Sequence, residues 1–303
     1  MQNLWLLAVC FALGALGRRY SRLPPESHRV VNAWVLDVAL PALVLKVVHA
    51  VPFDRRLLLA SGLLWVELGI AVGLALWAIR RGWASPGVAG ALALTSGLGN
   101  TAFVGLPLLE SLGGPGAVAP AAVMDQLGSF GVFSAVAVPF AAVVGGGQVK
   151  IRAVVMRLVR FFPFLALVLA LALRPVAFPP VVEGVLGKLA DTMSPLALAS
   201  VGWQLEARAL RGAFGRLALG LTYKLVVAPA MVLGVLWASQ SSFGLVERVA
   251  VAQAGMAPMV TAGVLALDSG LEPALASAMI AVGVPLSLLT VWLWWVGTGA
   301  LVT

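Results

Sequence analysis

Few residues of this chain could do chemistry, and most of them lie inside long apolar segments. Asn100 and Thr101 adjoin each other in a glycine-rich stretch, whereas Glu67, Asp125 and Lys224 are ionisable residues among apolar neighbours. An amide and a hydroxyl can hydrogen-bond an anion, and a carboxylate in such surroundings can carry a proton. Ionisable groups are costly in an apolar medium, which makes these residues candidates for function.

The acidic candidates and Lys224 show a repeated spacing. Glu67 and Lys224 lie 157 positions apart, and Asp37 and Asp191 lie 154 apart, which suggests equivalent positions in two halves of the chain. Glu67 is either locked to Lys224 in a structural pair or left unpaired as a proton carrier. A proton carrier must lack a permanent partner in one state of its cycle, so a locked pair makes Asp125 the better carrier, unless Asp125 only caps neighbouring backbone groups. Asp37 and Asp191 each precede a proline by four residues, and we expect them to accept hydrogen bonds from backbone that the proline leaves free.

The chain lacks the residue sets of common catalytic and metal sites. Its two histidines, His28 and His49, have no ligand spacing, and no Ser/His/Asp or Cys/His set is present. Cys10 is the single cysteine, so an internal disulfide is excluded. No nucleotide-binding motif lies in a suitable strand–turn–helix context. We therefore expect neither an enzyme nor an ATP-driven pump, and neither a cofactor nor a metal.

The composition places these residues in a membrane. Of the 303 residues, 61% are hydrophobic and 11% are charged, and the mean hydropathy is +1.02, whereas soluble domains carry roughly 25% charged residues. The segments between charge clusters approach the ~20 apolar residues that a helical span requires. The net charge of +8 comes from basic residues between these segments, which is typical of membrane topology and not of nucleic-acid binding. Membrane lipid is the expected partner, and nucleic acid is not.

The apolar segments predict an all-α polytopic protein with ten transmembrane helices. These helices are expected near 3–17, 30–49, 57–79, 87–112, 116–143, 161–173, 181–203, 215–237, 247–266 and 274–298. The odd-numbered connections hold thirteen basic residues and the even-numbered ones hold four. Because basic residues are enriched on the cytoplasmic side, we expect both termini outside, in a bacterial inner membrane.

The fourth and ninth predicted spans are interrupted. Residues 95–107 contain several glycines, Asn100 and Pro107, and residues 253–263 contain two glycines and Pro258. A membrane tolerates unwound backbone only where protein buries it or water reaches it. Paired interruptions at corresponding positions are the best sequence indicator of a transporter's binding site.

Asn100 has two alternative roles at the first interruption. If a half-helix begins near Leu106, its free N–H groups and positive dipole end would point at an anion, and Asn100 would add an amide donor. Otherwise Asn100 is a plain helix cap. The two roles can coexist.

The two halves of the chain are expected to be inverted repeats, because five spans per half reverse the direction of the chain. The first five-helix repeat would cover residues 1–143 and the second 161–303. Residues 144–160, glycine-rich and then basic, would form a cytoplasmic linker. The alternation of Arg with apolar residues in this linker suits a helix on the membrane surface.

A specific motif lies in the fourth span. It reads Asn-Thr-x-x-x-Gly-x-Pro-Leu, with Asn100, Thr101, Gly105, Pro107 and Leu108 at the named positions. This motif resembles the core of the auxin efflux carrier family, which comprises the plant PIN auxin exporters and bacterial carriers of malonate and related carboxylates. Residues 253–256 and 273–285 are similar to the ninth and tenth spans of that family.

The resemblance implies a crossed-helix fold, shared with bile-acid symporters and sodium–proton antiporters, and an elevator-like displacement of one helix group. It also implies transport of a small organic anion, auxin-like or malonate-like, bound between the broken spans. The expected substrate-binding residues are Asn100, Thr101, Gly105, Pro107, Gln253, Met256 and Pro258. The expected coupling residues are Glu67, Asp125 and Lys224.

Three departures from the family pattern weaken auxin itself as the substrate. Ala257 separates Met256 from Pro258, Gly99 replaces a proline of plant members, and the long hydrophilic loop of many plant members is absent. One alternative is a sodium-coupled organic-anion symporter of bile-acid type, although acidic ligands for a cation are missing near both interruptions. Another is a membrane receptor or assembly subunit that does not transport. The coupling ion, the direction of transport and the oligomeric state, for which a homodimer is one candidate, stay open.

Overall fold

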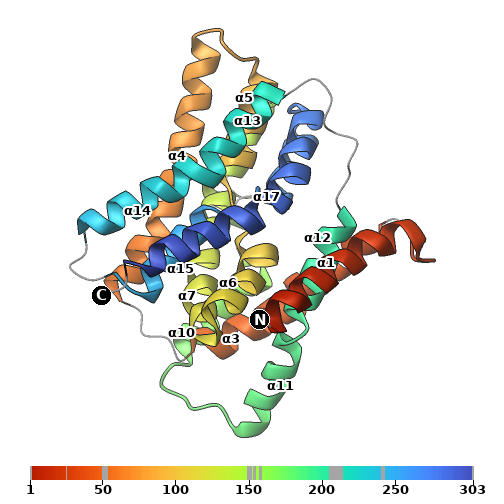
Figure 1. Ribbon diagram of the computed structural model, residues 1–303, viewed down its shortest axis with the longest axis vertical. Coiled ribbons are helices and arrows are strands. Elements are labelled where there is room, and N and C mark those ends of the chain that lie inside the picture. Colours follow the sequence, from red (N-terminus) through yellow and green to blue (C-terminus); the bar gives the residue numbers. More distant parts are fainter. Residues whose placement is uncertain are drawn as a thin grey trace.

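The chain is helical throughout the part that its computed structural model describes (Figure 1). The described residues are 2–24, 26–49, 54–148, 152, 155–156, 159–204, 214–239 and 243–301. The helices long and apolar enough to cross a membrane are Ser27–Val48, Arg55–Arg80, Pro115–Val144, Phe214–Ser239 and Pro273–Gly299. Shorter apolar helices are Thr101–Gly113 and Phe162–Ala172. The prediction of an all-α protein with several membrane-spanning helices is therefore confirmed.

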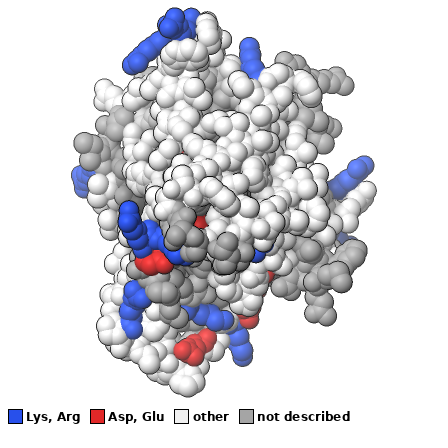
Figure 2. Space-filling view, turned by 60° about the vertical axis from the view of Figure 1, so that its left-hand side comes forward, with Lys and Arg blue, Asp and Glu red and all other residues white. Residues whose placement is uncertain are grey.

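The surface of the molecule suits a lipid environment. Large apolar side chains are exposed on many helices, among them Leu219, Trp237 and Val296. Figure 2 shows a broad uncharged area with Lys and Arg side chains mostly at its margins. Lipid tails are as apolar as these side chains, so the helices must associate through close van der Waals contact and buried polar contacts.

One group of helices forms a first bundle. It consists of α1 (Gln2–Tyr20), α2 (Ser27–Trp34) with its continuations η1 (Val35–Ala39) and α3 (Leu40–Val48), α10 (Phe162–Ala172), α11 (Pro180–Ala190) and α12 (Met193–Gln204). Helix α1 lies along α12, and α3 packs against α10 and α11. The approach of α1 to α12 depends on Gly14 and Gly202, because a Cβ on either glycine would collide with the backbone of the other helix.

The other described helices form a second bundle around the two interrupted spans. From the first half of the chain it contains α4 (Arg55–Arg80), α5 (Pro86–Gly97), η2 (Thr101–Gly105), α6 (Leu106–Gly113), α7 (Pro115–Val123), η3 (Met124–Phe130), η4 (Phe133–Ala137) and α8 (Val138–Val144). From the second half it contains α13 (Phe214–Thr222), η6 (Tyr223–Val227), α14 (Ala228–Ser239), α15 (Leu245–Ala254), α16 (Val260–Asp268) and α17 (Pro273–Gly299). The η segments are π-helical turns, which are rare and often lie at functional sites.

The two interruptions cross each other through backbone pairing. Gly99, between α5 and η2, forms an antiparallel bridge with Pro258, between α15 and α16. The Asn100 N–H donates to the Ala257 carbonyl at 2.7 Å, and the Met259 N–H donates to the carbonyl of residue 98 at 3.0 Å. Unwound backbone at membrane depth needs such partners. We call these paired segments, 98–100 and 255–259, the crossing.

The half-helix that leaves the first interruption begins earlier than the sequence predicted. It starts at Thr101, as η2, and continues into α6, so its first turn does not lie near Leu106. The reason is that Asn100 caps it, because the Asn100 side chain accepts from the Phe103 N–H. Pro107 lies at the start of α6 and does not interrupt the half-helix, which continues across it from η2.

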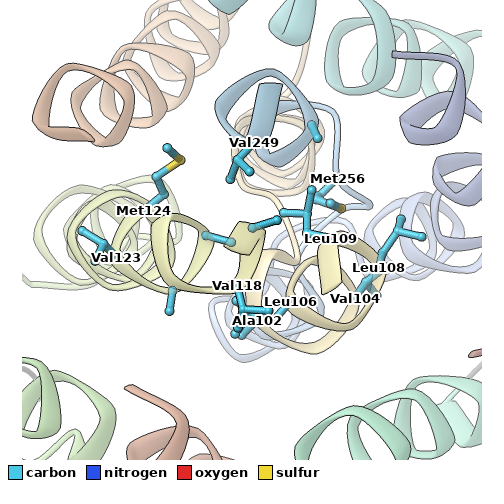
Figure 3. Close-up of a cluster of buried hydrophobic side chains, with 14 of the residues drawn as sticks. Ala102, Val104, Leu106, Leu108, Leu109, Val118, Val123, Met124, Val249 and Met256 are labelled. Atoms are coloured by element: carbon cyan, nitrogen blue, oxygen red, sulfur yellow. The ribbon is translucent and has the colours of Figure 1, made fainter. Parts of the chain in front are cut away.

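Buried apolar side chains pack around the half-helix. Leu106 and Leu109 of α6, Val118 of α7 and Met256 of the crossing belong to one buried cluster (Figure 3). On its other side, the half-helix contacts α1 and α12 of the first bundle. The half-helix therefore lies at the interface between the two bundles.

Two further predictions need correction. The predicted span 181–203 is two helices, α11 and α12, separated by a turn at Asp191 and Thr192. Asp37 and Asp191 are exposed, and neither carboxylate has a hydrogen bond to any residue that the structure describes. The physical reason is that a proline frees a carbonyl, which is an acceptor and cannot bond to an ionised carboxylate.

Some predictions concern residues that the structure does not describe. The expected surface helix of the linker 144–160 falls largely there: α8 ends at Val144, and Lys150 and Arg157 lie outside the described residues. Arg208 and Arg211, which entered the charge count, also lie outside them.

Candidate functional site

A cavity of about 230 Å³ lies between the two bundles at the crossing. Its wall on the side of the first bundle consists of Asn32, Leu36, Leu40, Phe161, Val201 and Gln204. Its wall on the side of the second bundle consists of Asn100, Ala102, Phe103, Asp125, Phe130, Phe133, Met259, Val260 and Thr261. This volume is close to the lower end of the roughly 300–1,000 Å³ of ligand pockets, so the cavity fits a small ligand. We call it the crossing cavity.

Asn100 lines the crossing cavity and has an unused hydrogen-bond donor. Its Oδ1 accepts from the Phe103 N–H at 3.1 Å, whereas its Nδ2 is buried and has no partner. A buried donor without a partner costs free energy that a bound ligand can recover. The N–H groups of the first turn of the half-helix begin directly after Asn100, at Thr101, and the first N–H groups of a helix have no partner within it. Asn100 is therefore both a helix cap and an open donor.

Asp125 is the carboxylate of the crossing cavity. It is 3% exposed, and its Oδ1 accepts from the Thr101 hydroxyl at 2.5 Å. Its Oδ2 accepts from the Gln126 Nε2 at 2.7 Å. Thr101, predicted to bind substrate, does not line the cavity but orients the carboxylate that does.

Aromatic rings make up much of the remaining wall. Phe103, Phe130, Phe133 and Phe161 line the cavity, and the rings of Phe130 and Phe161 stack across the two bundles with centroids 3.6 Å apart. None of these residues was predicted from the sequence, where apolar wall residues look like ordinary membrane-facing ones.

The first bundle adds polar residues that the sequence analysis also missed. Asn32 and Gln204 line the cavity, and both are linked to Ser200: its hydroxyl donates to the Asn32 Oδ1 at 2.5 Å, and the Gln204 Nε2 donates to that hydroxyl at 3.2 Å. An amide in an apolar span was the available signal for both residues, because polar groups inside a membrane are expensive.

The predicted residues of the second interruption shape the crossing and lie away from the cavity wall. The Gln253 Nε2 donates to the Ala121 carbonyl at 3.1 Å, and its Oε1 is buried without a partner. Pro258 pairs with Gly99 in the bridge. Met256 is fully buried beside the half-helix. Their described contacts are with protein backbone and apolar side chains.

Pro107 lines a second cavity of about 280 Å³, towards the other end of the half-helix. Lys46, Glu110 and Asp191 lie on its wall, and the Ser194 hydroxyl donates to the Glu110 Oε2 at 3.1 Å. This second cavity also lies between the two bundles, since α3, α11 and α12 face α6 and α7 across it.

Gly105 lies close to the end of the Gln253 side chain. A Cβ at Gly105 would lie 2.7 Å from the Gln253 Oε1, so we expect Gly105→Ala to displace that side chain from the Ala121 carbonyl and to destabilise the protein by roughly 1 kcal/mol, the net worth of one hydrogen bond. The measurement is the thermal unfolding midpoint of the purified protein. Gly69→Ala is the matched control, because a Cβ there meets nothing within 4 Å. Equal midpoints for the two variants would contradict the close approach.

Glu67 and Lys224 meet in a buried ion pair beside the crossing. The Lys224 ammonium also donates to the carbonyl of Ala254, the last residue of α15, at 2.8 Å. The Tyr223 hydroxyl donates to the backbone carbonyl of Glu67 at 2.6 Å. Of the two alternatives for Glu67, the structure contains the locked pair, and neither residue lines the crossing cavity.

Comparison with known proteins identifies the family of the chain. Residues 4–295 match the family described as membrane transport protein. A relative from Methanothermobacter thermautotrophicus, described as an uncharacterized transporter, is 27% identical over 290 residues, which cover 94% of each chain. The match over nearly the whole chain confirms the resemblance seen in the Asn100 motif. The chain therefore belongs to the membrane transport protein family, the family of the auxin efflux carriers.

Proposed function

We propose that this protein is a secondary carrier of small organic anions and that Asn100 binds the carboxylate of the substrate. The observation that carries the proposal is the buried, unpartnered Nδ2 of Asn100, a residue on the wall of a cavity between two bundles. The start of the half-helix lies at the same point and adds a positive dipole end. Half-helix N-termini bind anionic substrate groups in this way in other carriers with broken helices.

The cavity wall favours a monocarboxylate with an apolar body over a dicarboxylate. Four phenylalanines surround the polar groups, and they can bury an apolar body of matching size. A second carboxylate would need a second donor set or a cation, and no Lys or Arg is among the described residues of this wall. A malonate-like substrate therefore fits less well than a substrate such as benzoate.

An elevator-like displacement of the second bundle would carry the substrate between the two sides. The support is that the crossing cavity and the second cavity flank opposite ends of one half-helix at the interface between the bundles. Sliding the half-helix along the first bundle would move Asn100 from one cavity towards the other. Ten spans in two inverted repeats, with both termini outside a bacterial inner membrane, remain the topology that we propose for this motion.

The test is uptake of radiolabelled benzoate into proteoliposomes that are preloaded with unlabelled benzoate, with and without sodium. We expect protein-dependent uptake that external benzoate blocks, that malonate blocks poorly and that does not need sodium. Protein-free vesicles correct for permeation of the neutral acid. A sodium requirement would favour the bile-acid type of symporter. No protein-dependent uptake of benzoate or malonate would contradict a carboxylate carrier and favour a receptor or assembly subunit.

A further inference from the structure

We infer that one proton accompanies each carboxylate anion in the crossing cavity, held between Asp125 and the bound anion. The inference deepens the proposed function and rests on it, since it assigns the ion that is coupled to the substrate. The bound group has one negative charge and the proton one positive charge, so the pair that crosses the membrane is neutral. No covalent bond other than that to the proton is made or broken.

The geometry places two carboxylates in one small space. Asn100 and Asp125 line the same cavity of about 230 Å³, so an anion that reaches the Asn100 Nδ2 also lies near the Asp125 carboxylate. Two like charges repel strongly where little water screens them. Carboxyl groups that share one site resolve this conflict by sharing a single proton.

The described surroundings of Asp125 provide no cation that would remove the conflict. Its segment η3 packs against α4, α7, η2, η4 and α10, and of these only α4 carries titratable residues. Within α4, Glu67 is paired with Lys224, and Arg56 lies 3.9 Å from Glu247. Arg55 and Arg80 are exposed at the two ends of the helix.

The hydrogen-bond partners of Asp125 suit both of its protonation states. Gln126 now donates its Nε2 to the carboxylate, and its Oε1 is buried without a partner. Because an amide has a donor and an acceptor on opposite sides, a half-turn of this group would offer Oε1 to a protonated Asp125. The Thr101 hydroxyl can likewise donate or accept. Asp125 can therefore gain or lose the proton while it keeps both of its hydrogen-bond partners.

The test is isothermal titration of the purified full-length protein with benzoate near roughly pH 7, in two buffers with different protonation enthalpies. The difference in heat between the buffers gives the number of protons taken up. We expect about one proton per benzoate, and an affinity that falls about tenfold for each unit of rising pH, because anion binding then requires proton uptake. Asp125→Asn should bind benzoate with no proton uptake and with little dependence on pH.

Asp37→Asn is the matched control, because Asp37 is exposed and lines neither cavity; this variant should take up protons like the wild type. If Asp125→Asn does not fold, the number of protons that the wild type takes up per benzoate still tests the inference. Thr101→Val, which removes one donor to Asp125, should then shift the pH dependence of the affinity for benzoate. Benzoate binding by the wild type without proton uptake would overturn the inference and leave the proposed function intact. Proton uptake by Asp125→Asn equal to that of the wild type would also overturn the inference. No benzoate binding at all would contradict both.

Discussion

Lys224→Met should destabilise the protein by roughly 3–5 kcal/mol, because it leaves the Glu67 carboxylate buried without its partner. Both side chains are almost completely buried, at 1% exposure for Glu67 and 0% for Lys224. Solvent does not reach this ion pair, so water cannot replace a partner that a substitution removes. The measurement is the thermal unfolding midpoint in detergent, and Lys188→Met is the control, because Lys188 lies exposed on α11.

The double variant Glu67→Leu with Lys224→Met separates the ion pair from other effects. Replacing a buried pair by apolar residues of similar volume is often neutral, so the double variant should be clearly more stable than the single one. An equal loss of stability in the single and the double variant would show that the contact of Lys224 with the Ala254 carbonyl, and not the ion pair, accounts for the stability that Lys224 provides. That contact lies at the C-terminal end of α15, where a positive charge favours the helix dipole.

This result would also bear on coupling. A glutamate that is held by a lysine in the structure is a poor carrier of a proton that must be gained and lost during transport. Asp125 differs, because its described partners are the uncharged Thr101 and Gln126. The structure thus separates two residues that the sequence left as alternatives.

The helical membrane fold and the two interruptions could be predicted because the membrane imposes them on the sequence. A bilayer requires long apolar helices, and an interruption within one needs residues such as those at 98–100 and 255–259. The exact start of the half-helix could not be predicted. Pro107 is the residue of this stretch whose type suggests a helix boundary, but it lies several residues beyond the cap at Asn100. A proline inside a membrane helix is tolerated where a local π-helical turn, such as η2, satisfies the freed backbone groups, so it marks the end of a break poorly.

The apolar residues on the wall of the crossing cavity were harder to predict than the polar ones. Asn100 and Asp125 stand out as polar residues in apolar spans, whereas Phe130 and Phe161 have no local pattern that sets them apart. They come together only when η3 and the start of α10 meet across the two bundles. Such contacts depend on tertiary arrangement and leave no periodic signal.

Asn100→Leu should weaken benzoate binding about ten- to a hundredfold. The variant removes a hydrogen bond to a charged group, which is worth roughly 1.5–3 kcal/mol, and each ~1.4 kcal/mol is a factor of ten. It also removes the cap on the Phe103 N–H, which costs roughly 1 kcal/mol of stability. Isothermal titration with benzoate gives the first effect, and the thermal midpoint gives the second.

Asn100→Ser distinguishes the donor from the cap, because a serine hydroxyl still accepts from the Phe103 N–H but the residue has no amide to donate. It should keep most of the stability and lose most of the affinity, since its shorter, uncharged side chain does not replace the amide. Ser85→Ala is the control for capping alone: Ser85 caps α5 by accepting from the Val88 N–H and lies outside the cavity. That variant should lose stability and keep its affinity. Wild-type affinity in both Asn100 variants would limit Asn100 to a cap and move the carboxylate site elsewhere on the cavity wall.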